Sequence, residues 1–221
     1  MTVKCLPKKP MQSRPPIPAM TQEDEQRADA LIACARDFGQ RGWTPATSGN
    51  YSVRLDDGSF LITRSGGDKR RLDRAGLMRL DAAGNAIDPG RASAEAGLHV
   101  QIYREYPEVR AVLHVHSPHA TVASRQYEAA GALRFRNYEL LKAFEGVIGH
   151  DVEIELPVVA NEQDIDRLAA TIRPRLGQQG TAPGYLIAGH GAYAWGRSVA
   201  DAARHLEALD FLIQCELTDT R

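Results

Sequence analysis

Three histidines in two short segments have the residue types and spacing of a metal site. His114 and His116 lie two residues apart in the segment AVLHVHSPH (111–119), and His190 follows an apolar run and stands between two glycines. Residues two apart on a strand point to the same side of a sheet, so we expect His114 and His116 to project together. Three imidazoles leave one coordination position open, which is typical of catalytic rather than structural zinc.

Each part of this pattern also has an ordinary interpretation. Paired strand histidines are often polar residues on a solvated face, and His190 also fits a turn residue packed between glycines. His99 and His205 fall inside predicted amphipathic helices, where they are expected as core or interface groups. His119 and His150 are interpreted as a helix-start and a loop residue, with His119 near enough to the pair to support a ligand.

Two loops rich in hydroxyl side chains and glycine are typical of anion sites. TSGN (47–50) precedes a predicted strand, and TRSGGDK (63–69) follows one. Backbone N–H groups in such loops can surround a phosphate, and a serine at a helix start adds the helix dipole. Taken singly, each stretch is also typical of an ordinary turn, and neither matches a P-loop. The predicted phosphate-binding residues are Ser48, Gly49, Asn50, Ser65, Gly66 and Ser93.

Alternating helices and strands are predicted to position these residues. Apolar periodicity and capping signals such as Thr21 with Asp24 predict helices over 21–39, 93–106, 118–127, 138–144, 162–176 and 198–217. Buried or alternating runs predict strands over 51–55, 59–63, 109–114, 154–159, 185–188 and 192–195. This order, with a hairpin at Asp56–Gly58 and no internal repeat, favours a single-domain α/β fold: a mixed central sheet between two helical layers, α/β/α.

Composition limits the classes of partner. The chain has 221 residues, 43% hydrophobic, with a formal net charge of −1, which gives no reason to expect nucleic acid or a membrane surface. No apolar run reaches membrane-spanning length, and no apolar segment follows the N-terminal lysines, so neither a spanning helix nor a secretory signal is expected. A cytoplasmic location follows by default. Residues 1–20, rich in proline, are expected to be a flexible tail before a domain over 21–221.

Together these segments resemble the class II aldolase/adducin family, over about Gly42 to Glu216. HVHS and GHGAYAWGR are specific to the family, and NYELLKAFEG is typical of its dehydratase branch rather than of its sugar-phosphate aldolases. The resemblance is carried by GWTPATSGNYSVR (42–54), ITRSGGDKRRL (62–72), SAEAGLHVQIY (93–103), AVLHVHSPHATVAS (111–124), NYELLKAFEGV (137–147) and GYLIAGHGAYAWGRS (184–198).

The resemblance implies a fold, a cofactor and an assembly. The family has an α/β/α fold, one zinc per subunit and ring-shaped homotetramers with sites near subunit boundaries. The zinc ligands carry over to His114, His116 and His190. The implied activity is that of a dehydratase of methionine salvage, a hydro-lyase whose substrate is a small phosphorylated ketose.

Two glutamates compete for the role of acid and base. The dehydratase's catalytic glutamate falls on Glu139, whereas related aldolases place theirs at the position of Glu95. A human-type dehydratase has cysteine at the latter position, so this chain departs from that branch and resembles the bacterial one. Glu95 is also among the predicted substrate-binding residues. An apolar setting such as Leu140, Leu141 and Phe144 is expected to bring the pKa of Glu139 towards neutrality. From composition alone, Glu139 is equally typical of a solvated first-turn helix residue.

Two other functions remain open at this point. The same metal with Glu95 would suit an aldolase or epimerase acting on a short ketose phosphate, since the site alone does not choose between these reactions. An adducin-like binding module without catalysis is the second alternative, although such a module needs no metal ligands.

Overall fold

One mixed sheet of eight strands organises the molecule. The computed structural model describes residues 19–219, and the strand order is β3-β2-β1-β4-β8-β7-β6-β5. Every neighbouring pair is antiparallel except β6 with β7. The strands are β1 Asn50–Arg54, β2 Phe60–Thr63, β3 Leu77–Leu80, β4 Ala111–Val115, β5 Ala132–Arg136, β6 Glu153–Val159, β7 Gly184–Ile187 and β8 Gly191–Gly196.

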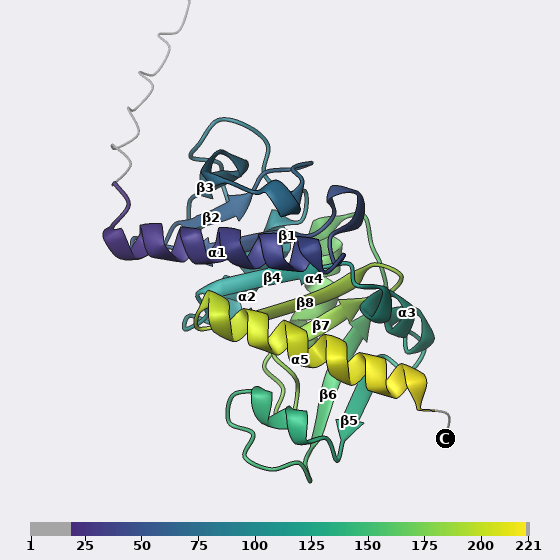
Figure 1. Cartoon of the computed structure of the whole chain (residues 1–221). Helices are drawn as coiled ribbons and strands as arrows, with labels where there is room; N and C mark the ends of the chain where they lie inside the picture. The colour runs from purple at the N-terminus through teal and green to yellow at the C-terminus, as the bar shows by residue number, and fades with distance from the viewer. Residues whose placement is uncertain (1–18, 220–221) are drawn as a thin grey trace, which may run out of the picture.

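Helices cover both faces of this sheet. One face carries α1 (Gln22–Gln40), α3 (Pro118–Gln126) and α5 (Val199–Thr218), and the other carries α2 (Ala96–Glu105) and α4 (Ile165–Ile172) (Figure 1). Successive side chains of β4 alternate between the two apolar cores, so Leu113 packs with the first and Val112 with the second. The expected three-layer α/β/α fold with a mixed sheet is confirmed.

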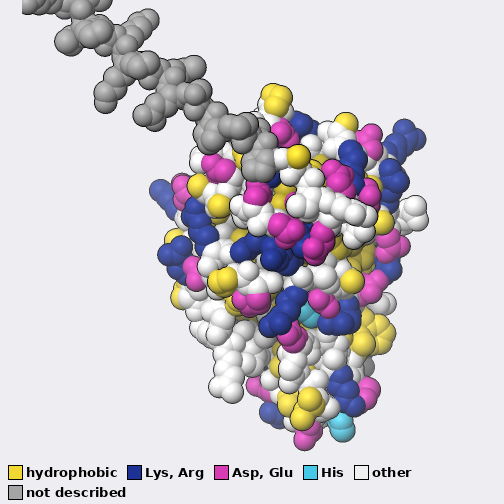
Figure 2. Space-filling view, turned by 90° about the vertical axis from the view of Figure 1, so that its left-hand side faces the viewer, with side chains coloured by type: hydrophobic (Ala, Val, Ile, Leu, Met, Phe, Trp, Pro, Cys, Tyr) yellow, Lys and Arg dark blue, Asp and Glu magenta, His cyan; other side chains and the backbone are white. Residues whose placement is uncertain are grey.

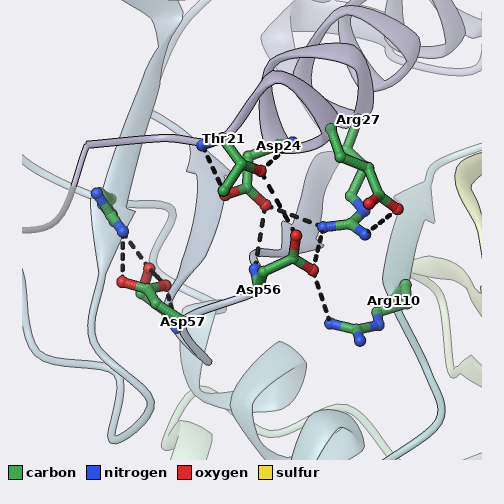
Figure 3. Close-up of polar contacts among 9 residues, drawn as sticks. Thr21, Asp24, Arg27, Asp56, Asp57 and Arg110 are labelled. Atoms are coloured by element: carbon green, nitrogen blue, oxygen red, sulfur yellow. Dashed lines mark hydrogen bonds and ion pairs between the residues drawn. The ribbon is translucent and has the colours of Figure 1, made fainter.

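The N-terminus of α1 is tied to the β1–β2 hairpin. Thr21 and Asp24 form the predicted capping box, because each side chain accepts a hydrogen bond from the other residue's backbone N–H. Asp24 also accepts from the backbone N–H of Asp56 at 3.1 Å, and Arg27 pairs with Asp56 at 2.7 Å (Figure 3). These contacts fix the hairpin, and with it β1, against the first helix.

Several predicted elements differ in detail. β3 and β5, the two short strands at the edges of the sheet, were not predicted. Ser93 does not cap α2, which begins three residues later with Glu95 as N-cap. The helix expected over 162–176 ends at Ile172 and continues as a 3₁₀ turn, η5 (Arg173–Arg175), because Pro174 lacks the N–H that a regular α-helix requires. The segment expected as a helix over 138–144 is the 3₁₀ turn η4 (Glu139–Ala143).

Three further 3₁₀ turns lie in the loop before β1 and in the connection between β2 and β3. They are η1 (Pro45–Thr47), η2 (Lys69–Arg71) and η3 (Arg74–Gly76). The η2 turn packs closely on α1: a Cβ added at Gly39 would lie 2.9 Å from the backbone nitrogen of Arg70, so glycine allows this approach. Arg36 of α1 also donates to the carbonyl of Leu72 at 2.7 Å.

The predicted N-terminal tail lies almost entirely outside the described residues. Of the expected tail over 1–20, only Ala19 and Met20 lie within the described residues, and Met20 packs against the larger core. No helix in residues 19–219 is long and apolar enough to cross a membrane. Acidic and basic side chains are interspersed over the face drawn in Figure 2.

Candidate metal centre and substrate pocket

Two neighbouring strands position the three histidines. His114 lies within β4, His116 follows the strand by one residue, and His190 occupies the turn that joins β7 to β8. Because β4 and β8 pair antiparallel, with Val115 opposite Ala192, the end of β4 meets the start of β8. The backbone N–H of His116 donates to the carbonyl of Trp43 at 2.8 Å, which holds that residue after its strand has ended.

Two glycines allow the close backbone contacts that the site requires. A Cβ at Gly191 would lie 2.1 Å from the carbonyl oxygen of Val115, so only glycine lets β8 approach β4 this closely. A Cβ at Gly49 would lie 2.7 Å from the carbonyl oxygen of His114, and Gly49 also has a φ of +76°. Gly191 therefore brings the start of β8, and Gly49 the loop before β1, directly against the strand that carries the first histidine.

The ring nitrogens of the three histidines converge. Nε2 of His114 lies 2.9 Å from Nε2 of His116 and 3.3 Å from Nε2 of His190. Tetrahedral ligands at zinc–nitrogen distances of 2.0–2.1 Å are about 3.3 Å apart, so this spacing fits a common cation. The three residues form a group able to hold a metal ion, with their ligand atoms all within 4.8 Å of one another.

Hydrogen bonding and burial prepare these rings as ligands. Nδ1 of His114 donates to the carbonyl of Ala192 at 3.0 Å, which leaves the lone pair of Nε2 facing the other two rings. Burial lowers the pKa of His114 to about 4, and burial with the two neighbouring imidazoles lowers the pKa of His116 to about 3. Neutral imidazoles whose nitrogens face one another need a cation to satisfy them, so the residues present fit a metal.

Glu95 is the carboxylate beside this cluster. Its oxygens lie 3.4 Å from Nε2 of His114 and 3.2 Å from Nε2 of His190, and its side chain is 14% exposed. Oε2 also accepts hydrogen bonds from Asn50 at 2.7 Å and from the Tyr193 hydroxyl at 2.8 Å. Burial alone would raise the pKa of Glu95, but the two histidines and the two hydrogen bonds lower it to about 2.

A buried chain of hydrogen bonds holds Glu95 through Asn50. The Asn50 amide donates to Glu95 while its carbonyl oxygen contacts Nε2 of His99. Nδ1 of His99 lies 2.7 Å from the Ser52 hydroxyl, which in turn lies 2.8 Å from the hydroxyl of Tyr103. Burial lowers the pKa of His99 to about 4. His99 is therefore a satisfied core residue, as expected, and it also orients the residue that positions Glu95.

The predicted phosphate loops and two of the histidines line one pocket of about 250 Å³. The Ser48 hydroxyl is buried there without a partner among the described residues. Ala46 and Thr47, just before it, have φ values of 50° and 66°, a strained conformation that is common at binding loops. The predicted residues brought together in this pocket are Ser48, Gly49, Asn50, Ser65, Gly66, Ser93, Glu95, His116 and His190.

Glu139 lies outside this pocket. Its side chain is 73% exposed and lines a different groove, of about 730 Å³, together with Leu140 and Phe211. The expectation of an apolar setting is wrong for the single chain: a hydrogen bond from Lys142 at 2.5 Å holds the pKa of Glu139 below its ordinary value. Leu141 is buried in the core, so its apolar surface turns away from the carboxylate.

Two further side chains lie at the site without having been predicted from the sequence. Tyr193 stacks on His114 with ring centroids 4.1 Å apart and donates to Glu95, and Lys69 lines the pocket. The alternating pattern of β8 could have assigned Tyr193 to one face of the sheet, because residues two apart on a strand point to the same side. No sequence signal marks Lys69 as buried, since lysine is normally exposed.

Comparison with known proteins agrees with this geometry. The model of the class II aldolase and adducin N-terminal domain matches residues 29–217. This chain belongs to the class II aldolase and adducin family. Among family members, the methylthioribulose-1-phosphate dehydratase of Xanthomonas euvesicatoria is 50% identical over 203 residues, covering 91% of this chain and 93% of the relative. That of Parvibaculum lavamentivorans is 50% identical over 192 residues, covering 87% and 93%.

Solved structures show the same class II aldolase fold. YgbL from Escherichia coli has a TM-score of 0.75 at 25% identity, covering 89% of this chain and 91% of its own. L-fuculose-1-phosphate aldolase from Thermus thermophilus has a TM-score of 0.69 at 27% identity, covering 87% and 93%. The family fold therefore serves proteins named for different reactions, and the sequence relatives at 50% identity are those named as dehydratases.

Proposed function

We propose that this chain is a methylthioribulose-1-phosphate dehydratase, a hydro-lyase of methionine salvage. The observation that carries the proposal is the convergence of three imidazole nitrogens beside a pocket lined by two hydroxyl- and glycine-rich loops. Relatives of that name at 50% identity favour dehydration over carbon–carbon cleavage. The reaction converts 5-methylthioribulose 1-phosphate to 2,3-diketo-5-methylthiopentyl 1-phosphate and water.

The metal in this proposal is zinc, held by His114, His116 and His190. Imidazole nitrogens with one coordination position left open are the donor set that catalytic zinc prefers. Bound zinc would supply Lewis-acid polarisation of the substrate ketone and its neighbouring hydroxyl, which acidifies the hydrogen on C3. Glu95, held by Asn50 and Tyr193, keeps a carboxylate beside two of the imidazoles.

Proton transfer is assigned to Glu139. In the proposed mechanism its carboxylate removes the proton from C3 and then, as an acid, protonates the C4 hydroxyl as it leaves as water. The enol that remains tautomerises to the diketone. Ser48, Gly49, Asn50, Ser65, Gly66 and Ser93 hold the phosphate of the substrate through hydroxyl and backbone N–H groups.

Glu139 would act on the pocket of a neighbouring subunit. Within one chain it lines a separate groove that also contains the exposed side chains of Leu140 and Phe211. The pocket at the histidines is smaller than most ligand sites, which suits a site completed by a second chain. The homotetramer suggested by the family resemblance, with sites near subunit boundaries, would bring the two together.

An aldolase or epimerase that uses Glu95 is the second candidate. The position of Glu95 beside His114 and His190 favours it, as does the likeness to a solved fuculose phosphate aldolase. An adducin-like binding module is disfavoured by the complete set of histidines.

Metal analysis coupled to a substrate comparison tests the proposal. The purified protein is assayed for zinc and for turnover of 5-methylthioribulose 1-phosphate, fuculose 1-phosphate and ribulose 5-phosphate. We expect one zinc per chain and release of water from the first substrate only. Cleavage or epimerisation of either sugar phosphate in place of dehydration would select the second candidate, and a protein that binds no metal would revive the binding module.

A further inference from the structure

Lys69 is a buried cation to which the proposed function assigns no role. It begins the η2 turn, and its side chain is almost inaccessible, with only 2% of the residue exposed. Its ammonium nitrogen lies 2.9 Å from the carbonyl oxygen of Thr47 and 2.9 Å from that of Gly67. These carbonyls belong to the two different loops that line the pocket, so one side chain joins both loops.

The ammonium group of Lys69 has no anionic partner within residues 19–219. An ammonium has three N–H donors, and the two carbonyls accept two of them. None of the ion pairs found there includes Lys69, and burial lowers its pKa despite the nearby charge of Asp68. Burying a charge without a counter-charge is costly, so binding of an anion at this position would be favourable.

The pocket is where such an anion would bind. Lys69 lines it together with Ser48, whose buried hydroxyl also lacks a partner there. Arg64 lines the same pocket, and among the described residues its guanidinium hydrogen-bonds only to backbone carbonyls. The carboxylate that lines this pocket, Glu95, accepts a hydrogen bond from Asn50 and faces the histidines. It therefore does not neutralise Lys69 or Arg64.

The position of Lys69 is fixed from outside the pocket. The η2 turn packs against α1 at Gly39, and Arg36 of α1 holds the carbonyl of Leu72 at the end of the turn. The backbone that carries Lys69 is therefore held by a regular helix, which lowers the ordering cost of ligand binding.

We propose that Lys69 determines specificity for the phosphate group of the substrate, by joining the two loops and supplying their buried positive charge. This inference rests on the proposed function only for the identity of the whole substrate. The chemistry of the site alone selects a phosphate dianion over a neutral hydroxyl at that end of the ligand.

Two substitutions separate the charge of Lys69 from its role in joining the loops. Lys69→Met removes both, whereas Lys69→Gln keeps amide donors for the carbonyls and removes only the charge. Arg71→Met is the matched control, because Arg71 lies exposed in the same turn and outside the pocket. Calorimetric titration of the zinc-loaded protein with inorganic phosphate gives the affinity, and zinc content and melting temperature are measured for every variant.

We expect phosphate to bind roughly 10- to 100-fold more weakly to both Lys69 variants, the range for losing a charged hydrogen-bond partner. The KM for the phosphorylated substrate should rise more than kcat falls, and Arg71→Met should stay within about twofold of the unmodified protein. A fully zinc-loaded Lys69→Gln protein with unchanged phosphate affinity would overturn the inference. Phosphate binding that depends on Lys69 in a protein without dehydratase turnover would uphold it and refute the proposed function.

Discussion

At the scale of single residues, Glu95 and Glu139 have contrasting environments. Glu95 is largely buried, accepts hydrogen bonds from Asn50 and Tyr193 beside two histidines, and has its pKa lowered to about 2. Glu139 is exposed and bonded to Lys142. A carboxylate restrained in this way is well suited to hold its neighbours in place. A group that must take up and release a proton needs fewer fixed partners, which the exposed glutamate has.

Glu139→Gln removes the ability to accept a proton while preserving side-chain size. We expect turnover of 5-methylthioribulose 1-phosphate to fall about 10²- to 10⁴-fold, the usual contribution of a general acid or base. Zinc should stay bound, because Glu139 lies outside the histidine group. Turnover and zinc content are measured together, with Glu145→Gln, an exposed glutamate of the same segment, as control. Unchanged turnover in Glu139→Gln would transfer the role to Glu95.

His190→Ala removes one of the three converging nitrogens. We expect the purified variant to contain well under one zinc per chain and to lack turnover, because two imidazoles form an incomplete donor set. Elemental analysis and zinc titration measure the effect. His150→Ala serves as control for zinc content alone, since His150 is exposed and outside the cluster but lies 3.9 Å from Glu139. Full zinc content in His190→Ala would mean that the metal is held elsewhere.

At the scale of elements, the tie between α1 and the β1–β2 hairpin supports the strand that carries Asn50. Asp24→Ala removes the Asp24 half of the capping box, keeps the cap by Thr21, and leaves the backbone N–H of Asp56 without its partner. We expect a loss of about 1–3 kcal/mol in the free energy of unfolding, measured by urea denaturation. Asp29→Ala, which breaks only an exposed ion pair of the same helix with Arg74, should cost under about 1 kcal/mol. Equal losses in the two variants would contradict this account.

The sequence predicts the strongly patterned elements and fails where the pattern is short or local geometry decides. β5 has an alternating burial pattern in Ala132–Arg136 that could have been recognised, whereas β3 has only four residues, all buried. Helix periodicity cannot distinguish a 3₁₀ turn from an α-helix over five residues, so η4 was assigned the wrong type. These errors lie away from the histidines, whose strand and turn were both predicted.

The site itself was predictable where residue type and spacing carry information. The HxH pair, the glycine-flanked histidine and the hydroxyl loops all have patterns that local chemistry explains. The contributions of Lys69 and Tyr193 depend on which strands and turns meet in space, which no local pattern records. Glu139 is exposed in the single chain. Its surroundings in an assembly would depend on contacts between subunits, which no local sequence pattern records.

At the scale of the whole molecule, the separation of Glu139 from the histidines predicts complementation between subunits. Co-expressing Glu139→Gln with His190→Ala gives mixed assemblies in which some sites combine an intact metal group with an intact glutamate. If each site uses the glutamate of one neighbour, random assembly restores about one quarter of the sites.

Turnover of the co-purified mixture tests this, with each variant expressed alone as the inactive control. Light scattering should give a mass near four times the 24.2 kDa of one chain. Activity no higher than that of the separate variants, in a confirmed mixed assembly, would place both groups in the same chain.

The pairing of β4 with its two neighbours has a consequence for biosynthesis. Asn50 and Tyr193, on β1 and β8, are both direct cross-strand partners of His114. A slip of one residue in either pairing would turn that partner to the opposite layer, away from the histidine. The complete metal site can therefore form only after the central strands have paired in the native register. A chain trapped in a slipped arrangement would lack the complete cluster, so the amount of tightly held metal in a refolded sample reports the fraction of molecules that reached the native pairing.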